Sequence, residues 1–327
     1  MYHNDAAGGA TIETAVLRFW FLILVAAAAP AQVLYEVAGR VSPEGRASVT
    51  LFGATHPFTA STFTDEGGRF TFKKLAAATY TLAVYQPGRG EARQTIEVGP
   101  SLANSRNRIH LRIALKEADF DTTSDRRRHS VTARELKIPE RAVREYADAQ
   151  RDLEKRDVDA AEKHLEHAVE LAPQFASAWN TLGTIAYQTR RFPLAEQRFR
   201  QALKQDPTVY EALVNLGGAL VTQHKLDEAL EVNAHATLIR PNDALANSQL
   251  GMTYFELGQF DSAVKYLERA RQIDPGHFSH PQLFLAEIRL RRGQKREAAS
   301  VLEDFLQHHP DYPQGEVMRR HIVELRQ

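Results

Sequence analysis

Residues 179–207 read WNTLGTIAYQTRRFPLAEQRFRQALKQDP, and the chain repeats the pattern of this stretch several times. The stretch ends on a proline, and prolines recur at intervals of 34, 34, 34 and 35 residues, at Pro173, Pro207, Pro241, Pro275 and Pro310. A fixed period near 34 residues is typical of a solenoid built from helix pairs. Because proline cannot continue a helix, each of these prolines is expected to end the second helix of a unit.

Small residues keep the same phase in every unit. Alanine stands twelve residues before each proline, at Ala161, Ala195, Ala229, Ala263 and Ala298, and a Leu-Gly pair recurs at Leu182-Gly183, Leu216-Gly217 and Leu250-Gly251. Gly and Ala let two helices cross closely, while larger residues fill the space between the crossings. This pattern resembles the tetratricopeptide repeat family. The resemblance implies about five helix-pair repeats over residues 139–310, and we expect residues 311–327 to form a capping helix.

Residues 32–116 show the two-residue period of half-buried strands. Apolar residues alternate in five runs, at 33–37, 47–51, 70–72, 80–84 and 109–115, and turn sequences such as Asp65-Glu66-Gly67-Gly68 separate them. This pattern predicts a small β-sandwich of about seven strands, with one core face and one wet face on each sheet. The run from Val37 to Val41, the stretch from Thr64 to Phe72 and the run from Tyr80 to Val84 resemble the carboxypeptidase regulatory-like domain. That resemblance implies a non-catalytic β module.

Two segments flank this module. Residues 1–31 carry Arg18, an apolar run from Phe19 to Ala29 and a small-residue cleavage site at Ala29-Pro30-Ala31, which together are typical of a cleaved secretory signal. An uncleaved membrane anchor is the alternative. Residues 117–138 are polar, with three aspartates before a short basic run, and are expected to form a solvated linker. The sequence therefore predicts an exported protein, periplasmic or associated with a bacterial cell envelope.

The composition argues against several classes of function. Lys plus Arg and Asp plus Glu both number 41, so no overall basic field favours nucleic acid, and the absence of cysteine excludes disulfides and thiolate zinc sites. The sequence lacks the common hydrolase, metalloprotease, phosphate-loop and dinucleotide motifs. His164, His167 and Glu170 lie at metal-ligand spacing on one helix, but surface positions explain them better. We therefore expect no catalytic residue, no metal and no cofactor.

The candidate binding residues lie on the first helices of the repeats, which line the concave groove of such solenoids. Positions one, five and eight residues after Trp179, and their equivalents in later units, give a mixed and mostly apolar set. The selected groove residues are Asn180, Thr184, Tyr187, Val214, Val221, Ser248, Met252, Phe255 and Glu287. Tyr187, Val221, Met252 and Phe255 form a predicted apolar stripe, which either lies open or is covered by neighbouring helices.

The fold class predicted is thus a multidomain β plus α chain, in which a seven-stranded β-sandwich precedes an α-solenoid. The function predicted is that of a non-enzymatic scaffold, which binds a peptide segment or a partner helix in its concave groove. The alternative is an envelope assembly or glycan-associated structural protein, in which the β domain is the recognition element. The expected partner is a protein or peptide and not a nucleic acid, and contact with a membrane is expected only through an uncleaved signal.

Overall fold

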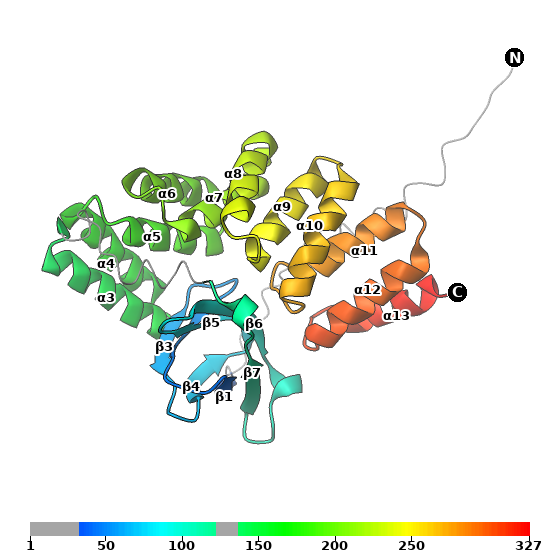
Figure 1. Ribbon diagram of the computed structural model, residues 1–327, viewed down its shortest axis with the longest axis horizontal. Coiled ribbons are helices and arrows are strands. Elements are labelled where there is room, and N and C mark those ends of the chain that lie inside the picture. The colour runs from blue at the N-terminus through cyan, green and yellow to red at the C-terminus, as the bar shows by residue number, and fades with distance from the viewer. Residues whose placement is uncertain (1–32, 122–136) are drawn as a thin grey trace, which may run out of the picture.

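The computed structural model describes residues 33–121 and 137–327. The predicted signal segment lies outside these residues, as does most of the predicted linker. The described residues form seven strands followed by eleven α-helices. This order confirms the predicted fold class, a β-sandwich followed by a solenoid of helix pairs. Figure 1 shows the strands gathered together on one side of the helices.

The β domain consists of two sheets packed face to face. Its strands are β1 (Leu34–Ser42), β2 (Ser48–Gly53), β3 (Thr59–Phe63), β4 (Arg69–Ala76), β5 (Ala78–Gln86), β6 (Gly90–Val98) and β7 (Arg108–Ala114). One sheet has the order β4-β1-β7 and the other the order β3-β2-β5-β6. Strand β1 pairs with β7 in parallel, whereas the other pairs are antiparallel.

The alternating apolar residues of the sequence point between the two sheets. Val37, Leu51, Tyr80 and Ile109 are at most 2% exposed and belong to one hydrophobic cluster. The turn before β4 requires a glycine at Gly68, whose φ of 72° lies in the left-handed region. The backbone carbonyl of Gly68 accepts a hydrogen bond from the Val41 amide, so the turn ties β4 to β1.

The helices follow in antiparallel pairs. They are α3 (Glu140–Lys155), α4 (Val158–Leu171), α5 (Ala176–Gln188), α6 (Phe192–Gln205), α7 (Tyr210–Thr222), α8 (Leu226–Ile239), α9 (Ala244–Glu256), α10 (Phe260–Ile273), α11 (Pro281–Arg291), α12 (Lys295–His308) and α13 (Gly315–Leu325). The five alanines twelve residues before the prolines are all 0% exposed, as close helix crossings require. Helix α13 buries Met318, Ile322 and Leu325 against the last pair.

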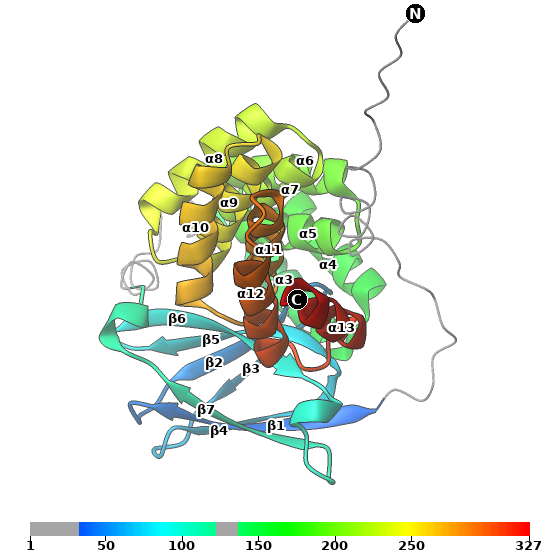
Figure 2. The same ribbon diagram turned by 90° about the vertical axis from the view of Figure 1, so that its right-hand side faces the viewer.

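The helix pairs form an arc, and the β domain lies on its inner side (Figure 1). Sheet β3-β2-β5-β6 lies next to the helices, and sheet β4-β1-β7 is the layer farthest from them (Figure 2). The inner side of the repeats therefore faces part of the same chain.

Within the described residues, no helix has both the length and the apolar content needed to cross a membrane.

Candidate functional site

The polar face of sheet β3-β2-β5-β6 turns toward the helices. On this face Thr50 of β2, Thr81 of β5 and Thr95 of β6 alternate with residues that point into the sandwich core. The sequence predicted that each sheet would have one solvent-exposed face. For this sheet that prediction needs correction. Its polar residues are opposed by the inner side of the repeats, because the helix arc folds back over the sheet.

The opposing helices contribute amide and hydroxyl side chains among apolar and charged ones. Asn180, Thr184 and Gln188 lie on successive turns of α5, and Asn215 lies on α7. The side-chain amide nitrogen of Asn215 is 3.4 Å from both Asn180 Oδ1 and Thr184 Oγ1. These distances are long for hydrogen bonds, so the groups are held near one another by weak contacts.

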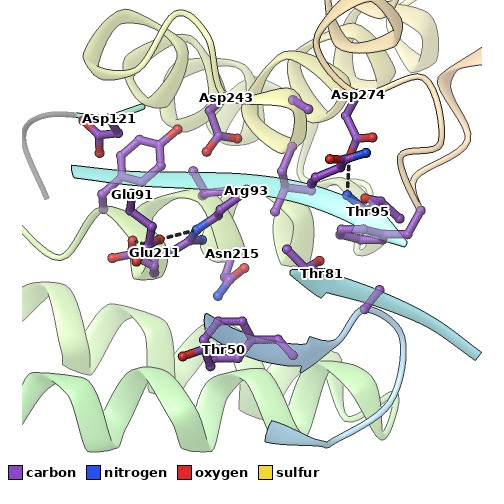
Figure 3. A pocket seen from close by; sticks show the side chains of 18 of the residues that line it. Thr50, Thr81, Glu91, Arg93, Thr95, Asp121, Glu211, Asn215, Asp243 and Asp274 are labelled. Carbon is purple, nitrogen blue, oxygen red and sulfur yellow. Dashed lines mark hydrogen bonds and ion pairs between the residues drawn. The ribbon is translucent and has the colours of Figure 1, made fainter. Parts of the chain in front are cut away.

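Between these two surfaces lies a cavity of about 1070 Å³. Figure 3 shows Thr50, Thr81 and Thr95 on the sheet side, with Asp243 and Asp274 on the helix side. This volume is slightly above the range of about 300–1,000 Å³ that is usual for small-molecule sites. The cavity therefore has room for a larger ligand or a short segment of chain.

Two buried hydroxyl groups in the cavity wall lack a hydrogen-bond partner among the described residues. They belong to Thr95, which is 6% exposed, and Tyr210, which is 3% exposed. Burial, together with the nearby carboxylate of Asp243, raises the pKa of Tyr210, so its hydroxyl keeps its proton and can donate a hydrogen bond. Buried polar groups are usually paired, so these two hydroxyls, whose oxygens are enclosed by protein atoms, are unused hydrogen-bonding groups next to the cavity.

Strand β6 connects the sheet to the later repeats through alternate residues. Arg93 pairs with Glu211 at 3.2 Å, and the Thr95 amide donates to Asp274 Oδ2 at 2.9 Å. Farther along, Glu97 Oε1 lies 2.8 Å from Nδ1 of the buried His309. Because β6 is the edge strand of its sheet, the helix ends satisfy backbone and side-chain groups that would otherwise face solvent.

The first repeats are attached by separate contacts. Gln188 Nε2 donates to the Gly53 carbonyl at 2.8 Å, and the Arg156 guanidinium donates to the Lys74 carbonyl at 2.9 Å. The β domain is thus held at both ends of the arc, and the cavity lies between the attachment points.

The structure divides the predicted groove residues into two groups. Asn180, Thr184 and Val214 line the cavity. The other six are not among its lining residues: Tyr187, Val221, Ser248, Met252, Phe255 and Glu287. Their contact with a partner stays a prediction.

The predicted apolar stripe is largely occupied by neighbouring side chains. Val221 is 7% exposed within a hydrophobic cluster, and Met252 is partly buried against the next repeat. The ring of Phe255 packs on Phe284 at 5.2 Å, and the guanidinium of Arg291 lies over it at 5.2 Å. The alternative that neighbouring helices cover the stripe is therefore the one that the geometry favours.

The two histidines at metal-ligand spacing both lie against one carboxylate. Nδ1 of His164 lies 2.7 Å from Glu145 Oε2, and Nδ1 of His167 lies 2.9 Å from Glu145 Oε1. The hydrogen bond from His164 lowers the pKa of Glu145. Glu145, Asp148 and His164 also bring potential ligand atoms within 4.8 Å of one another. Pairing between α3 and α4 accounts for this arrangement.

The sequence patterns do not identify the residues of β6 that contact the repeats. Arg93, Thr95 and Glu97 lie in a polar stretch outside the five alternating runs that predict strands. A weak signal was present, since Ala92, Ile96 and Val98 keep the two-residue period on the core side.

Comparison with known proteins supports both domains. A model of the carboxypeptidase regulatory-like domain matches residues 36–112, and tetratricopeptide repeat models match 146–208, 180–244, 224–278 and 254–316. The repeat matches together cover more than half of the chain.

The curated relatives match part of the chain. ALBINO3-like protein 2, chloroplastic, from Arabidopsis thaliana is 32% identical over 36% of this chain and 26% of its own length. A TPR repeat-containing protein from Treponema pallidum is 29% identical over 36% of this chain and 14% of its own length. The chain therefore spans only a small part of the curated relatives that it matches.

The solved structure of PilW, described as a widely conserved type IV pilus biogenesis factor, has a TM-score of 0.50 at 21% identity, over 56% of this chain and 85% of that chain.

Helix-pair repeats of this kind form scaffolds for protein–protein interaction. With its repeats matched in sequence and in fold, the chain belongs to the tetratricopeptide repeat family and carries a carboxypeptidase regulatory-like domain ahead of the repeats.

Proposed function

We propose that this protein is an exported interaction module that binds an extended peptide segment of a partner protein in the cavity between its sheet and its repeats. Its role is binding without catalysis. Export to the periplasm or cell envelope rests on the apolar leader in residues 1–31.

The observation that carries the proposal is the chemistry of the cavity wall. A peptide backbone offers one donor and one acceptor per residue, and it binds best to groups that can do both. Asn180 and Asn215 have amides with both functions, and the hydroxyls of Thr95 and Tyr210 have no protein partner to give up. The long contacts of Asn215 also make its amide available at little cost.

The shape of the cavity favours an extended segment over a helix. The wall on one side is the polar face of a sheet, with Thr50, Thr81 and Thr95, whereas an amphipathic helix requires an apolar groove. The apolar residues predicted to form such a groove are covered by their own neighbours. An extended partner segment is therefore the ligand that we expect.

Site-specific photo-crosslinking in cells tests this proposal. A photo-reactive residue replaces Thr184 in the cavity, and the control carries it at Gln197, which is exposed on α6 of the same helix pair and outside the cavity. We expect a partner adduct from the first position only, with the attachment sites confined to one short segment of the partner. The changes Asn180→Leu and Asn215→Leu should suppress it.

Equal adducts from both positions, or an adduct that survives the two asparagine changes in a folded protein, would contradict the cavity as the binding site. Export is tested separately by fractionating cells that express the chain with and without residues 1–31. Recovery of the full chain in the cytoplasm would refute export and leave the cavity proposal standing.

A further inference from the structure

The outward face of sheet β4-β1-β7 is basic. Its cationic side chains all come from residues that alternate with the core positions of the three strands, and all are exposed: Arg40, Arg69, Lys73, Arg108 and Arg112. Glu36 is the only acidic residue that these strands direct to the same face. We call this surface the basic face. The whole chain has equal numbers of acidic and basic residues, so the excess here is local.

Three of these cations form a row across the sheet. Arg40 of the central strand is in register with Arg69 of β4 on one side and with Arg112 of β7 on the other. Neighbouring strands lie about 4.8 Å apart, and like charges placed directly opposite one another destabilise a sheet. We call these three residues the arginine row. Within the row Arg40 has bonds of its own, to the Gly67 carbonyl at 3.1 Å and to Glu44, whereas no ion pair within the described residues offsets the charges of Arg69 and Arg112. A role in binding accounts for these two charges.

Few of these charges are neutralised within the protein. Arg40 pairs with Glu44, and Arg108 pairs with Glu36 at 2.9 Å. For Arg69, Lys73 and Arg112, no carboxylate of the described residues lies within ion-pair distance. The basic face thus keeps three exposed cations without a counter-ion among the described residues, beside two that are paired.

We propose that the basic face binds the anionic headgroups of a phospholipid bilayer. The charges spread in two dimensions over an open sheet face, on the far side of the β domain from the cavity. Attraction to a charged bilayer surface requires no pocket, and each Lys or Arg near the surface contributes to it independently. A flat array of separate cations is therefore suited to a bilayer more than to a single enclosed anion.

The sequence next to this sheet points to the same partner. The apolar run of the leader ends at Ala29, five residues before Leu34 begins the central strand β1. Five residues span at most about 18 Å, so the basic face emerges close to the membrane that the leader engages. An apolar segment combined with a basic patch is a known two-signal arrangement for membrane attachment, and after cleavage the patch would give reversible binding.

The orientation leaves the proposed peptide site free. Figure 2 shows sheet β4-β1-β7 on the opposite side of the sandwich from the helices. With the basic face on a bilayer, the repeats and the cavity project away from the membrane. This inference does not depend on peptide binding, and either one can fail without the other.

The test measures partition of the full chain onto phosphatidylcholine vesicles with and without phosphatidylglycerol. We expect stronger binding to the anionic vesicles, weakening as salt is raised. Changing the arginine row to glutamine should lower binding to anionic vesicles roughly 100-fold. Binding through the leader alone would be similar for both vesicle types and unaffected by these changes.

A matched control removes three exposed charges from the helices instead, by Arg144→Gln, Lys163→Gln and Arg320→Gln. This control should keep the anionic preference, and an equal loss would show that net charge, and not the basic face, is responsible. A second variant changes the arginine row to lysine. It should retain binding, since a bilayer surface responds to charge, whereas loss would indicate bidentate recognition of another anion.

The variant Glu36→Gln provides an independent gain-of-function test, because it should strengthen binding to anionic vesicles. Circular dichroism verifies the folding of each variant. No preference of the parent chain for anionic vesicles would overturn the proposal. So would binding to a soluble polyanion such as heparin that depends on the arginine row while vesicle binding does not.

Discussion

The contact between Asp274 and β6 gives the sharpest test of how the two domains are joined. Asp274 is the C-cap residue of α10, is 6% exposed, and accepts a hydrogen bond of 2.9 Å from the Thr95 amide. Thr95 lies on the edge strand of its sheet. Replacing Asp274 with alanine leaves this buried amide without its acceptor.

The size of the effect follows from the kind of bond lost. A hydrogen bond to a charged group contributes about 1.5–3 kcal/mol, and an unpaired buried donor carries a penalty of similar size. We therefore expect the docking of β6 on the repeats to weaken by about 10- to 100-fold. The other attachment points should keep the domains folded, so the change is local.

Hydrogen exchange measured by mass spectrometry reports this directly, because docking protects the Thr95 amide. In Asp274→Ala, peptides that cover β6 should exchange about 10- to 100-fold faster, while peptides from α5 and α6 should be unchanged. The control is Asp206→Ala, at the equivalent position two units earlier. Its carboxylate accepts bonds from Thr208, at 2.9 Å from the amide and 2.7 Å from the hydroxyl. Unchanged exchange in β6 of Asp274→Ala, or equal acceleration in both variants, would refute the reasoning.

Two further predictions concern stability. Gly183→Ala should destabilise the chain by about 1–3 kcal/mol in thermal unfolding, because the added Cβ would lie 2.6 Å from the buried ring of Phe199. Adding Phe199→Leu to this variant should recover part of the lost stability, and no recovery would argue against the clash. Burial, with the nearby His309 and His277, lowers the pKa of His280 from 6.5 to about 3, so the folded state binds fewer protons than the unfolded state between these values. The free energy of unfolding should therefore fall by up to about 5 kcal/mol as the pH drops from 6.5 toward 3. His280→Asn, which tolerates the left-handed backbone there, should flatten this dependence in denaturant titrations; the same slope in both proteins would contradict it.

The helix-pair architecture could be predicted from the sequence because its constraints are local and periodic. A close crossing requires a small residue once in each unit, and residues such as Ala195 and Ala229 are fully buried at those crossings. The strands of the sandwich core were predictable for a similar reason, since burial on one face imposes a two-residue period. Strand β6 was harder because Gln94, at a core-side position, is exposed at the sheet edge.

The candidate site was only partly predictable. Asn180 and Thr184 were placed on the inner side of α5 by their phase in the repeat, and they do line the cavity. The phase could not show that Phe284 and Arg291 would cover Phe255, because those contacts depend on how successive units stack. Nor could it show that a sheet from the same chain would form the opposite wall. Both are long-range consequences of tertiary packing.

At one position in the repeat, the type of residue nevertheless reflects the contact between the two domains. The residue just before the closing proline is Asp206, Arg240, Asp274 and His309 in successive units. In the first of these units the side chain has only to cap its own turn, as Asp206 does by binding Thr208.

The later three residues contact β6 or the segment next to it. Arg240 pairs at 2.9 Å with Asp121, which forms a β-bridge with Glu91 of β6, Asp274 accepts from Thr95, and His309 lies against Glu97. The residue type at this position differs with the group that it contacts: the cation Arg240 contacts a carboxylate, and the anion Asp274 contacts a backbone amide. Packing within the solenoid would have favoured a uniform residue at this phase, as it does at the buried alanines. A change of residue type at a fixed phase of a repeat therefore indicates a contact from outside the repeat, and here that contact comes from the chain itself.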